Sequence, residues 1–234
     1  MRIALMIVSV IFVFPIYLIK MALYAKSKNW DRFKAHAYIQ KRAIAANKHG
    51  RVIVDVHGVE NLPEKDGFVF FPNHQGMYDM MVFLESCPRP FAFVAKQETK
   101  NIPLLKQTIA VTHSLTMDRK DLRQSMEVIK EMTRRIKEGE NFVIFAEGTR
   151  SRMGNKMNEM KAGSFKSAVK AEAPIVPVAL IDCFKPFDER SIKKVTVKAF
   201  YLKPMYFDEY KDMSTQEIAA EVKRRIEEVI AANS

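Results

Sequence analysis

The sequence predicts an α/β fold in which a mostly parallel central sheet is flanked by helices. From Val52 onward, short runs of β-branched and aromatic residues alternate with stretches whose apolar residues recur at helical spacing. This alternation is typical of strands joined by crossover helices. Polar and charged residues follow directly after several of the strand-like runs. Parallel strands end at one edge of a sheet, and α/β proteins place their functional sites there.

The length and charge of the chain indicate one large domain with a basic N-terminal segment. At 234 residues it is long enough to bury a substantial core. The net charge of +11 and the pI near 9.6 suggest an anionic partner. Ten Lys and Arg residues up to Arg51 stand against one acidic residue, Asp31. We therefore expect a membrane-anchoring two-helix segment over residues 1–50 and an α/β domain over residues 51–234.

The first predicted element is the apolar run from Ile3 to Ile19, which only Ser9 and Pro15 interrupt. A membrane-spanning helix needs about 20 apolar residues, so this run either crosses the bilayer or enters one leaflet. No small-x-small cleavage site follows it, so a signal peptide is not favoured.

The second predicted element covers residues 26–48, where aromatic and aliphatic side chains alternate with Lys and Arg. This composition is typical of a helix on an anionic membrane surface, although an ordinary solvated basic helix is an alternative. Together the two elements predict a helical hairpin at the cell membrane. The remainder of the chain would lie on the Lys/Arg-rich cytoplasmic side.

The α/β part contains seven predicted strands and three well-marked helices. One helix is expected over residues 121–137, with Asp121 as its N-cap and Gly139 after its end. Another covers residues 162–171, and a capping box at Ser214–Glu217 opens a last helix that ends near Ala232. The strands are predicted over residues 52–56, 68–71, 91–95, 114–117, 142–145, 175–181 and 195–202.

The first candidate catalytic pair follows the strand at residues 68–71, where His74 precedes Asp79 by five positions. Histidine suits general-base catalysis near neutral pH, especially when a carboxylate fixes its tautomer and stabilises the imidazolium. On one helix, residues five apart point about 140° away from each other. We therefore expect His74 in the turn after the strand and Asp79 in the first turn of the next helix. A purely structural His–carboxylate pair in a loop is the alternative.

A second cluster follows the strand at residues 142–145 and begins with Glu147. Gly148 lets backbone N–H groups approach a ligand, and Thr149 and Arg150 carry donors that suit phosphate oxygens. The alternative for Arg150 is a solvated surface cation. For Glu147 the alternative is a structural carboxylate that pairs with an arginine.

Two further candidates lie at the ends of other predicted strands: Lys96, with Glu98 beside it, and Arg119. In a parallel sheet these side chains fall at the same edge as His74, so all of them could meet in one crevice. The two cysteines, Cys87 and Cys183, lie in apolar surroundings without a Cys-x-x-Cys pair. Neither a disulfide nor a zinc site is therefore expected, and the His and carboxylate spacing predicts no other metal site.

Taken in order, these motifs resemble the 1-acyl-sn-glycerol-3-phosphate acyltransferase family of glycerolipid synthesis, bacterial type. The resemblance covers residues 52–202 and rests on Asn73-His74-x4-Asp79, Lys96-x-Glu98, Met117-Asp118-Arg119, Phe145-x-Glu147-Gly148-Thr149-Arg150, Lys161-x-Gly163 and Val176-Pro177-Val178. It implies the glycerolipid acyltransferase fold, with His74 as catalytic base and Asp79 as the residue that orients it. It also implies an acceptor phosphate site formed by Arg119, Glu147, Gly148, Thr149 and Arg150, and we add Lys96 to the substrate-binding candidates.

Two positions depart from the family pattern, which often has Ser at Gly76 and Pro at Ala146. Neither would supply the essential proton transfer, so we interpret both as tolerated variation.

The resemblance implies transfer of an acyl group from acyl-CoA or acyl-carrier protein to the sn-2 hydroxyl of lysophosphatidate, which forms phosphatidate for phospholipid biosynthesis. His74 would take the hydroxyl proton, and Asp79 would stabilise the imidazolium. No enzyme nucleophile is needed, and no Gly-x-Ser-x-Gly elbow is present. We expect no cofactor, because the thioester is itself a substrate.

Three alternatives remain. An enzyme of the same superfamily could use glycerol 3-phosphate or another lysophospholipid as acceptor, and a thioester hydrolase would need no acceptor. A non-catalytic protein that binds anionic lipid or nucleic acid would also explain the charge. Nucleic acid is the less favoured partner, because the basic excess lies beside an apolar run and aromatic–basic interleaving is absent from the α/β part.

Overall fold

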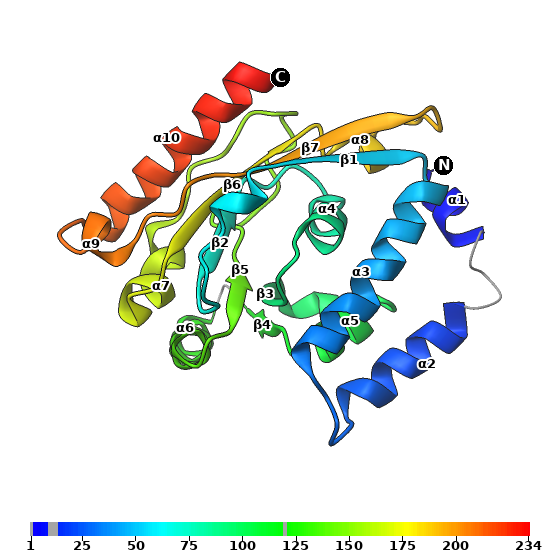
Figure 1. Ribbon diagram of the computed structural model, residues 1–234, viewed down its shortest axis with the longest axis horizontal. Coiled ribbons are helices and arrows are strands. Elements are labelled where there is room, and N and C mark those ends of the chain that lie inside the picture. Colours follow the sequence, from blue (N-terminus) through cyan, green and yellow to red (C-terminus); the bar gives the residue numbers. More distant parts are fainter. Residues whose placement is uncertain (1, 9–13, 119–120) are drawn as a thin grey trace.

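A sheet with helices on both faces forms the centre of the molecule in the computed structural model, which describes residues 2–8, 14–118 and 121–234 (Figure 1). Within these residues the sheet has seven strands in the order β1-β7-β6-β2-β5-β3-β4. All strand pairings are parallel except β6 with β7. The prediction of an α/β fold with a mostly parallel sheet is therefore confirmed.

The strands match the predicted runs closely. Their bounds are β1 Val52–His57, β2 Val69–Pro72, β3 Phe91–Lys96, β4 Leu115–Met117, β5 Asn141–Val143, β6 Ile175–Ile181 and β7 Val195–Tyr201. β5 is shorter than predicted, although the Ile144 N–H still donates to the Phe70 carbonyl at 3.0 Å. Because β6 is parallel to β2, the carboxyl ends of β2 to β6 all lie at one edge of the sheet.

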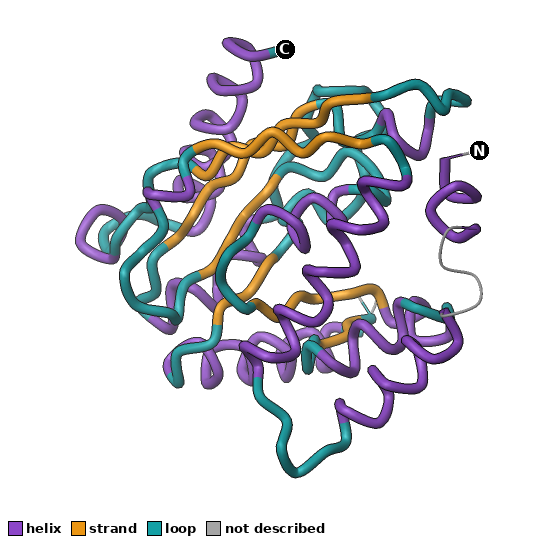
Figure 2. Tube along the Cα trace, turned by 45° about the vertical axis from the view of Figure 1, so that its right-hand side comes forward, coloured by secondary structure: helices purple, strands orange, loops and turns teal. Residues whose placement is uncertain are grey.

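The helices cover the two faces of the sheet and each face has its own core (Figures 1 and 2). The side chains of β2 show why there are two cores, because successive side chains of a strand point to opposite faces of the sheet. Phe70 faces α4 (Asp79–Ser86), where its ring meets Phe83 edge-on with centroids 5.6 Å apart. Phe71 faces the other core and stacks on Phe165 at 4.1 Å.

The capped helices begin where their sequence signals predict. The Asp121 carboxylate accepts from the Gln124 N–H at 3.0 Å and opens α6 (Leu122–Lys137). The capping box at Ser214 opens α10 (Thr215–Asn233). The predicted helix at 162–171 is a 3-10 turn, Ala162–Phe165, followed by α7 (Lys166–Ala171). The other short elements are α5 Leu105–Val111, α8 Lys185–Asp188, α9 Phe207–Tyr210 and the 3-10 turns Val59–Asn61 and Gln97–Asn101.

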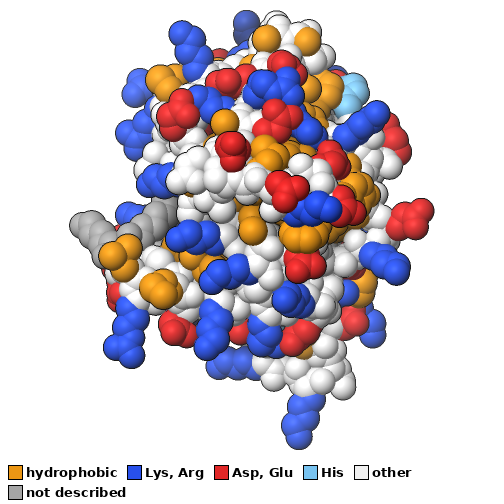
Figure 3. Space-filling model, turned by 90° about the vertical axis from the view of Figure 1, so that its left-hand side faces the viewer, with side chains coloured by type: hydrophobic (Ala, Val, Ile, Leu, Met, Phe, Trp, Pro, Cys, Tyr) orange, Lys and Arg blue, Asp and Glu red, His pale blue; other side chains and the backbone are white. Residues whose placement is uncertain are grey.

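The outer face of α6, α7 and α10 carries positive and negative charges in close alternation (Figure 3). On α10, Arg224 pairs with Glu221 and Glu228 at 2.8 and 2.5 Å. These pairs are exposed, so solvent screening leaves each of them only a small contribution to folding. The mixed charge of this face contrasts with the N-terminal segment, where Lys and Arg are almost unopposed.

The N-terminal segment forms α1 (Arg2–Val8), α2 (Phe14–Ala25) and α3 (Arg32–His49). Part of the predicted first element, including Ser9, lies outside the described residues. Pro15 lies in the first turn of α2, where its missing N–H would have no helical partner. Within the described ranges, no helix combines the length and apolar character needed to cross a bilayer. The anchoring role of residues 1–50 stays a prediction.

α3 packs into the α/β unit along one side. Ala35, Ile39 and Ala43 are buried in the core that also contains Phe70. Phe33 and Ile44 are exposed on the other side of the helix. The predicted surface helix therefore has one buried face and one free face.

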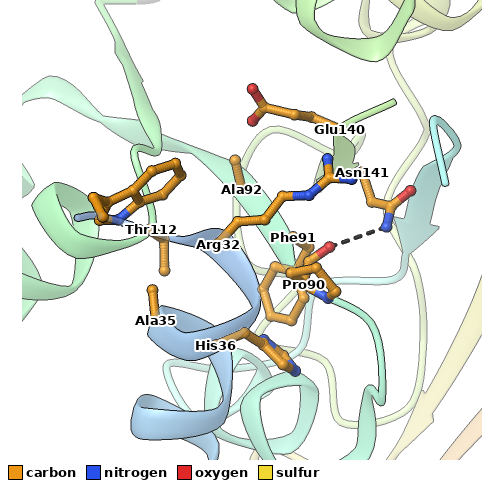
Figure 4. A pocket seen from close by; sticks show the side chains of 10 residues that line it. Arg32, Ala35, His36, Pro90, Phe91, Ala92, Thr112, Glu140 and Asn141 are labelled. Carbon is orange, nitrogen blue, oxygen red and sulfur yellow. Dashed lines mark hydrogen bonds between the residues drawn. The ribbon is translucent and has the colours of Figure 1, made fainter. Parts of the chain in front are cut away.

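A small cavity of about 20 Å³ lies between α3 and the amino ends of β3 and β5 (Figure 4). The Arg32 guanidinium reaches across from α3 and donates to the Gly139 carbonyl. The Asn141 amide donates to the Pro90 carbonyl at 3.0 Å (Figure 4). These contacts lie at the amino ends of the strands. The candidate catalytic residues follow the carboxyl ends of β2 and β5, so they lie at the opposite edge of the sheet.

Candidate active site

Asn73 sets the direction in which the chain leaves β2. Its amide Nδ2 donates to the Leu180 carbonyl at 2.9 Å, and its Oδ1 accepts from the Leu180 N–H at 2.7 Å. The side chain thus imitates a further residue of β2 paired with β6. Because Asn73 takes this place, the backbone can turn away and expose the next residue, His74.

His74 and Asp79 lie where the spacing predicts, the first in the turn and the second at the start of α4. The imidazole Nδ1 is 2.7 Å from Asp79 Oδ2. The Gln75 and Gly76 N–H groups donate to the same carboxylate at 2.8 and 3.1 Å. The amino end of α4 also favours a negative charge. The loop between the two residues therefore folds around the carboxylate that orients the imidazole.

The pair combines a buried carboxylate with a reachable imidazole. The side chain of Asp79 is 1% exposed and that of His74 is 21% exposed. Burial raises the pKa of the Asp79 carboxyl above its ordinary value, while hydrogen bonds from His74 and two backbone N–H groups act in the opposite direction. With Nδ1 held by Asp79, Nε2 is the nitrogen that can accept a proton from a substrate. The ring packs against Phe145 at 4.2 Å.

Glu147 holds the backbone of the loop that carries His74. Its Oε1 accepts from the His74 N–H at 2.6 Å and its Oε2 accepts from the Asn158 N–H at 2.7 Å. The His74 carbonyl in turn accepts from the Ser151 N–H at 2.8 Å. Burial raises the pKa of the Glu147 carboxyl, and these backbone hydrogen bonds oppose the shift. The structural interpretation of Glu147 thus gains support, with backbone amides as partners in place of an arginine.

The residues that follow Glu147 form the turn expected of a ligand-binding loop. Gly148 has φ +78°, a left-handed conformation that glycine adopts readily. A side chain there would also come within 3.0 Å of Lys161 Cε. Thr149 is exposed and Arg150 is half-buried. Arg150 and Arg152 line an open cavity of about 420 Å³ with Gly154, Phe184 and Asp188. Two guanidinium groups in one cavity suit a phosphate.

Lys96 is placed differently from Arg150. Lys96 pairs with Glu98 at 2.9 Å, and both side chains are more than half exposed. Neither is among the residues that line the cavity. Arg119 lies outside the described residues.

Sequence reasoning missed a set of polar side chains around the His74 loop. Gln75 is 1% exposed and bonds both to Asn155 and to the backbone of Cys183. Asn155 also bonds to Asp182, which directly follows β6. Gln75 lies inside the His-x4-Asp motif, which could have drawn attention to it. The partners Asn155 and Cys183 are 80 and 108 residues away from Gln75, and no local pattern indicates them.

The thiols are closed off from substrate. Both cysteines are buried. Burial raises the pKa of Cys87 to about 12 and raises that of Cys183 well above its usual value. A thiolate is the nucleophilic form, so neither group suits an acyl-enzyme. Within the described residues, no group of three or more His, Cys, Asp or Glu is arranged to hold a metal ion.

The sequence is similar to those of known acyltransferases. The profile of the family described as "Acyltransferase" matches residues 53–181. The chain is 28% identical over 183 residues to the chloroplastic 1-acyl-sn-glycerol-3-phosphate acyltransferase BAT2 of Brassica napus, covering 76% of this chain and 53% of that protein. It is 28% identical over 164 residues to the 1-acyl-sn-glycerol-3-phosphate acyltransferase of Escherichia coli (strain K12), covering 70% and 66%.

A solved structure extends the similarity over nearly the whole fold. The crystal structure of the 1-acyl-sn-glycerophosphate (LPA) acyltransferase PlsC from Thermotoga maritima superposes with a TM-score of 0.75 at 25% identity, covering 98% of both chains. Against the first curated relatives the coverage is smaller, since the chain spans about half of their length. The match to the family profile includes both the His74–Asp79 pair and the loop that begins at Glu147. The chain therefore belongs to the acyltransferase family.

Proposed function

We propose that this protein transfers an acyl group from an acyl thioester to the sn-2 hydroxyl of 1-acyl-sn-glycerol 3-phosphate and so forms phosphatidate. The observation that carries the proposal is the His74–Asp79 pair, joined by backbone hydrogen bonds to a loop whose arginines line a cavity. The similarity to proteins named as 1-acyl-sn-glycerol-3-phosphate acyltransferases supports this acceptor.

In this reaction His74 acts as general base. Its Nε2 takes the proton of the acceptor hydroxyl as the oxygen attacks the thioester carbonyl, and Asp79 stabilises the imidazolium at Nδ1. The tetrahedral intermediate then collapses, the C–S bond breaks, and the imidazolium returns the proton to the leaving thiolate. The products are the ester and the free thiol, so the reaction requires no cofactor. Acyl-CoA and acyl-carrier protein both supply such a thioester.

The cavity lined by Arg150 and Arg152 suits the phosphate of the acceptor. We assign Arg150, which lines it, to bind the phosphate oxygens, and keep Lys96 and Arg119 as further candidates. Gly148 and Thr149 shape the turn that presents Arg150. A phosphate held in this cavity would place the sn-2 hydroxyl near Nε2, and such positioning supplies much of the rate of a two-substrate reaction.

A position at the cell membrane fits the lipid substrate and the exposed side of the N-terminal helices. On α2, Ile16, Ile19 and Leu23 are 49%, 59% and 67% exposed. They share the helix with Lys20 and precede the basic α3. Apolar side chains flanked by unopposed cations favour an anionic bilayer surface. We propose that α2 and the exposed face of α3 lie on the membrane, with the α/β domain on its cytoplasmic side.

The deciding experiment is transfer of a labelled acyl group to lysophosphatidate, from acyl-CoA and separately from acyl-carrier protein. Wild-type protein and His74→Ala are compared in liposomes. We expect phosphatidate from the wild type and none above background from the variant, with folding checked by circular dichroism. Glycerol 3-phosphate and an acceptor-free mixture are run beside it. Product on glycerol 3-phosphate alone, or thioester loss that needs no acceptor, would reject the proposal.

A further inference from the structure

We propose that the segment Asp182–Phe184, which follows β6, is a specificity-determining wall of the acceptor cavity, and that Phe184 makes the cavity select a phosphomonoester over a phosphodiester. We base this inference on the proposed function, and it adds a residue that determines the head-group preference. Four observations support it: the hydrogen bonds that dock the segment, its backbone conformation, its contact with Gly76, and the place of Phe184 in the cavity.

The segment is docked on the catalytic loop by Gln75. The buried Gln75 Oε1 accepts from the Cys183 N–H at 2.7 Å, and its Nε2 donates to Asn155 Oδ1 at 2.7 Å. A backbone N–H can only donate, so the orientation of this amide is determined by Cys183. Gln75 is the residue after His74. The wall and the catalytic base are therefore held by adjacent residues of one loop.

Asn155 fixes the start of the segment through two hydrogen bonds to Asp182. Its Oδ1 accepts from the Asp182 N–H at 2.9 Å, and its Nδ2 donates to Asp182 Oδ1 at 3.1 Å. Lys185 pairs with the second carboxylate oxygen at 2.7 Å. Asp182 has φ 63°, in the left-handed region that non-glycine residues rarely adopt. Such a conformation persists where surrounding contacts hold it, and it is often found at functional sites.

Gly76 allows the wall to approach closely. A Cβ atom at this position would lie 3.2 Å from Phe184 Cα and 3.5 Å from the Cys183 carbonyl oxygen. The backbone of the segment would have to shift to admit it. The glycine is then a determinant of cavity shape in this chain.

Phe184 brings an apolar ring into a cavity that is otherwise charged. Its ring edge lies 3.7 Å from the position of a Cβ on Gly154, and the cavity is also lined by Arg150, Arg152 and Asp188. A phosphomonoester offers its free oxygens to the guanidinium groups and carries nothing beyond them. A phosphoethanolamine head group would extend past the arginines. Its ethanolamine part would then be desolvated by contact with the Phe184 ring, where it gains no hydrogen bond. Removing the ring would open a path for its ammonium group toward Asp188.

The test compares kcat/KM for lysophosphatidate and for 1-acylglycerophosphoethanolamine with the same acyl chain and donor. In Phe184→Ala we expect the preference for lysophosphatidate to fall by about tenfold or more, because specificity ratios of this size follow from one apolar contact. Phe184→Leu keeps an apolar wall and should retain most of the preference. Gly76→Ala should lower it in the same direction, since its Cβ displaces the segment.

Phe187 provides the matched control, because it lies in α8, the short helix whose N-cap residue is Phe184, but its ring packs on Tyr78 at 5.0 Å. Phe187→Ala should leave the ratio of the two kcat/KM values unchanged, whatever it does to stability. An unchanged ratio in Phe184→Ala, or an equal change in Phe187→Ala, would overturn the assignment of Phe184.

A binding measurement separates failure of this inference from failure of the proposed function. Thermal shift with glycerol 3-phosphate and with glycerophosphoethanolamine needs no turnover. If the wild type transfers acyl groups to neither acceptor, the proposed function fails. The wall is then supported if the wild type is stabilised by glycerol 3-phosphate alone and Phe184→Ala by both ligands. It is rejected if both proteins respond equally to the two ligands.

Discussion

Replacing Asp79 by Asn would separate the charge of the carboxylate from its role as a hydrogen-bond acceptor. Asp79 Oδ2 accepts from His74 Nδ1 at 2.7 Å, from the Gln75 N–H at 2.8 Å and from the Gly76 N–H at 3.1 Å. An asparagine Oδ1 in that place can keep all three bonds. Its amide nitrogen would then face the Gly76 N–H, which is 3.1 Å from the other carboxylate oxygen in the native protein.

The magnitude follows from these distances and from burial. Two donors in contact at a fully buried position cost about 1–3 kcal/mol of folding free energy, so the variant should still fold. At 2.7 Å, the attraction between imidazolium and carboxylate is at most about 6 kcal/mol for an effective dielectric constant of about 20. General-base catalysis by a positioned group contributes about 10²–10⁴ in rate. We therefore expect kcat to fall by about 10²–10⁴, with KM for the acceptor within about threefold of wild type.

The assay is steady-state acyl transfer at several pH values, with thermal unfolding measured on the same preparations. A variant that folds as expected and retains kcat within about threefold would refute the role of the Asp79 charge. A variant that unfolds at the assay temperature would show that we have underestimated the structural role of the carboxylate. Asp55→Asn is a suitable control, since Asp55 pairs with an exposed histidine, His57, at 3.0 Å.

Three further predictions test the residues around the pair. Arg150→Gln should raise KM for the phosphate-bearing acceptor by about tenfold or more and leave KM for the thioester donor nearly unchanged; a larger change for the donor would contradict the assignment. Glu147→Gln should lower the free energy of unfolding by about 1–3 kcal/mol, because an amide would face a backbone N–H. In contrast, Glu98→Gln at an exposed ion pair should change it by less than about 0.5 kcal/mol. Because burial raises the folded-state pKa of Glu147 above 4.5, ionisation opposes folding. The stability of wild type relative to Glu147→Gln should thus be greatest below pH 4.5 and decline as pH rises toward the folded-state pKa. Denaturant unfolding across this range checks the sign, and a rising difference would refute it. Cys87 and Cys183 should stay unmodified by a thiol reagent at pH 8 in folded protein and react in denaturant; a trapped acyl-cysteine during turnover would contradict the direct mechanism.

Local features of this protein could be predicted because they depend on residues close together in the chain. The alternation of Phe70 and Phe71 between two cores follows from the two-residue period of a strand. The caps at Asp121 and Ser214 act on backbone groups three residues away. The His74–Asp79 contact spans five residues and one turn. In each case the spacing and the geometry of the element leave few arrangements, so the sequence was sufficient.

The tertiary structure alone decided which distant groups meet these residues. Glu147 was expected at the acceptor phosphate or paired with an arginine, but its carboxylate binds the backbone of His74, 73 residues earlier. Gln75 meets Cys183 across 108 residues, and α3 has one side in the core and one side free. Such contacts depend on the order of strands in the sheet and on how loops pack at its edge. A carboxylate or amide accepts any N–H that packing brings within reach, so its partner is determined by the fold, and residue type alone does not reveal it.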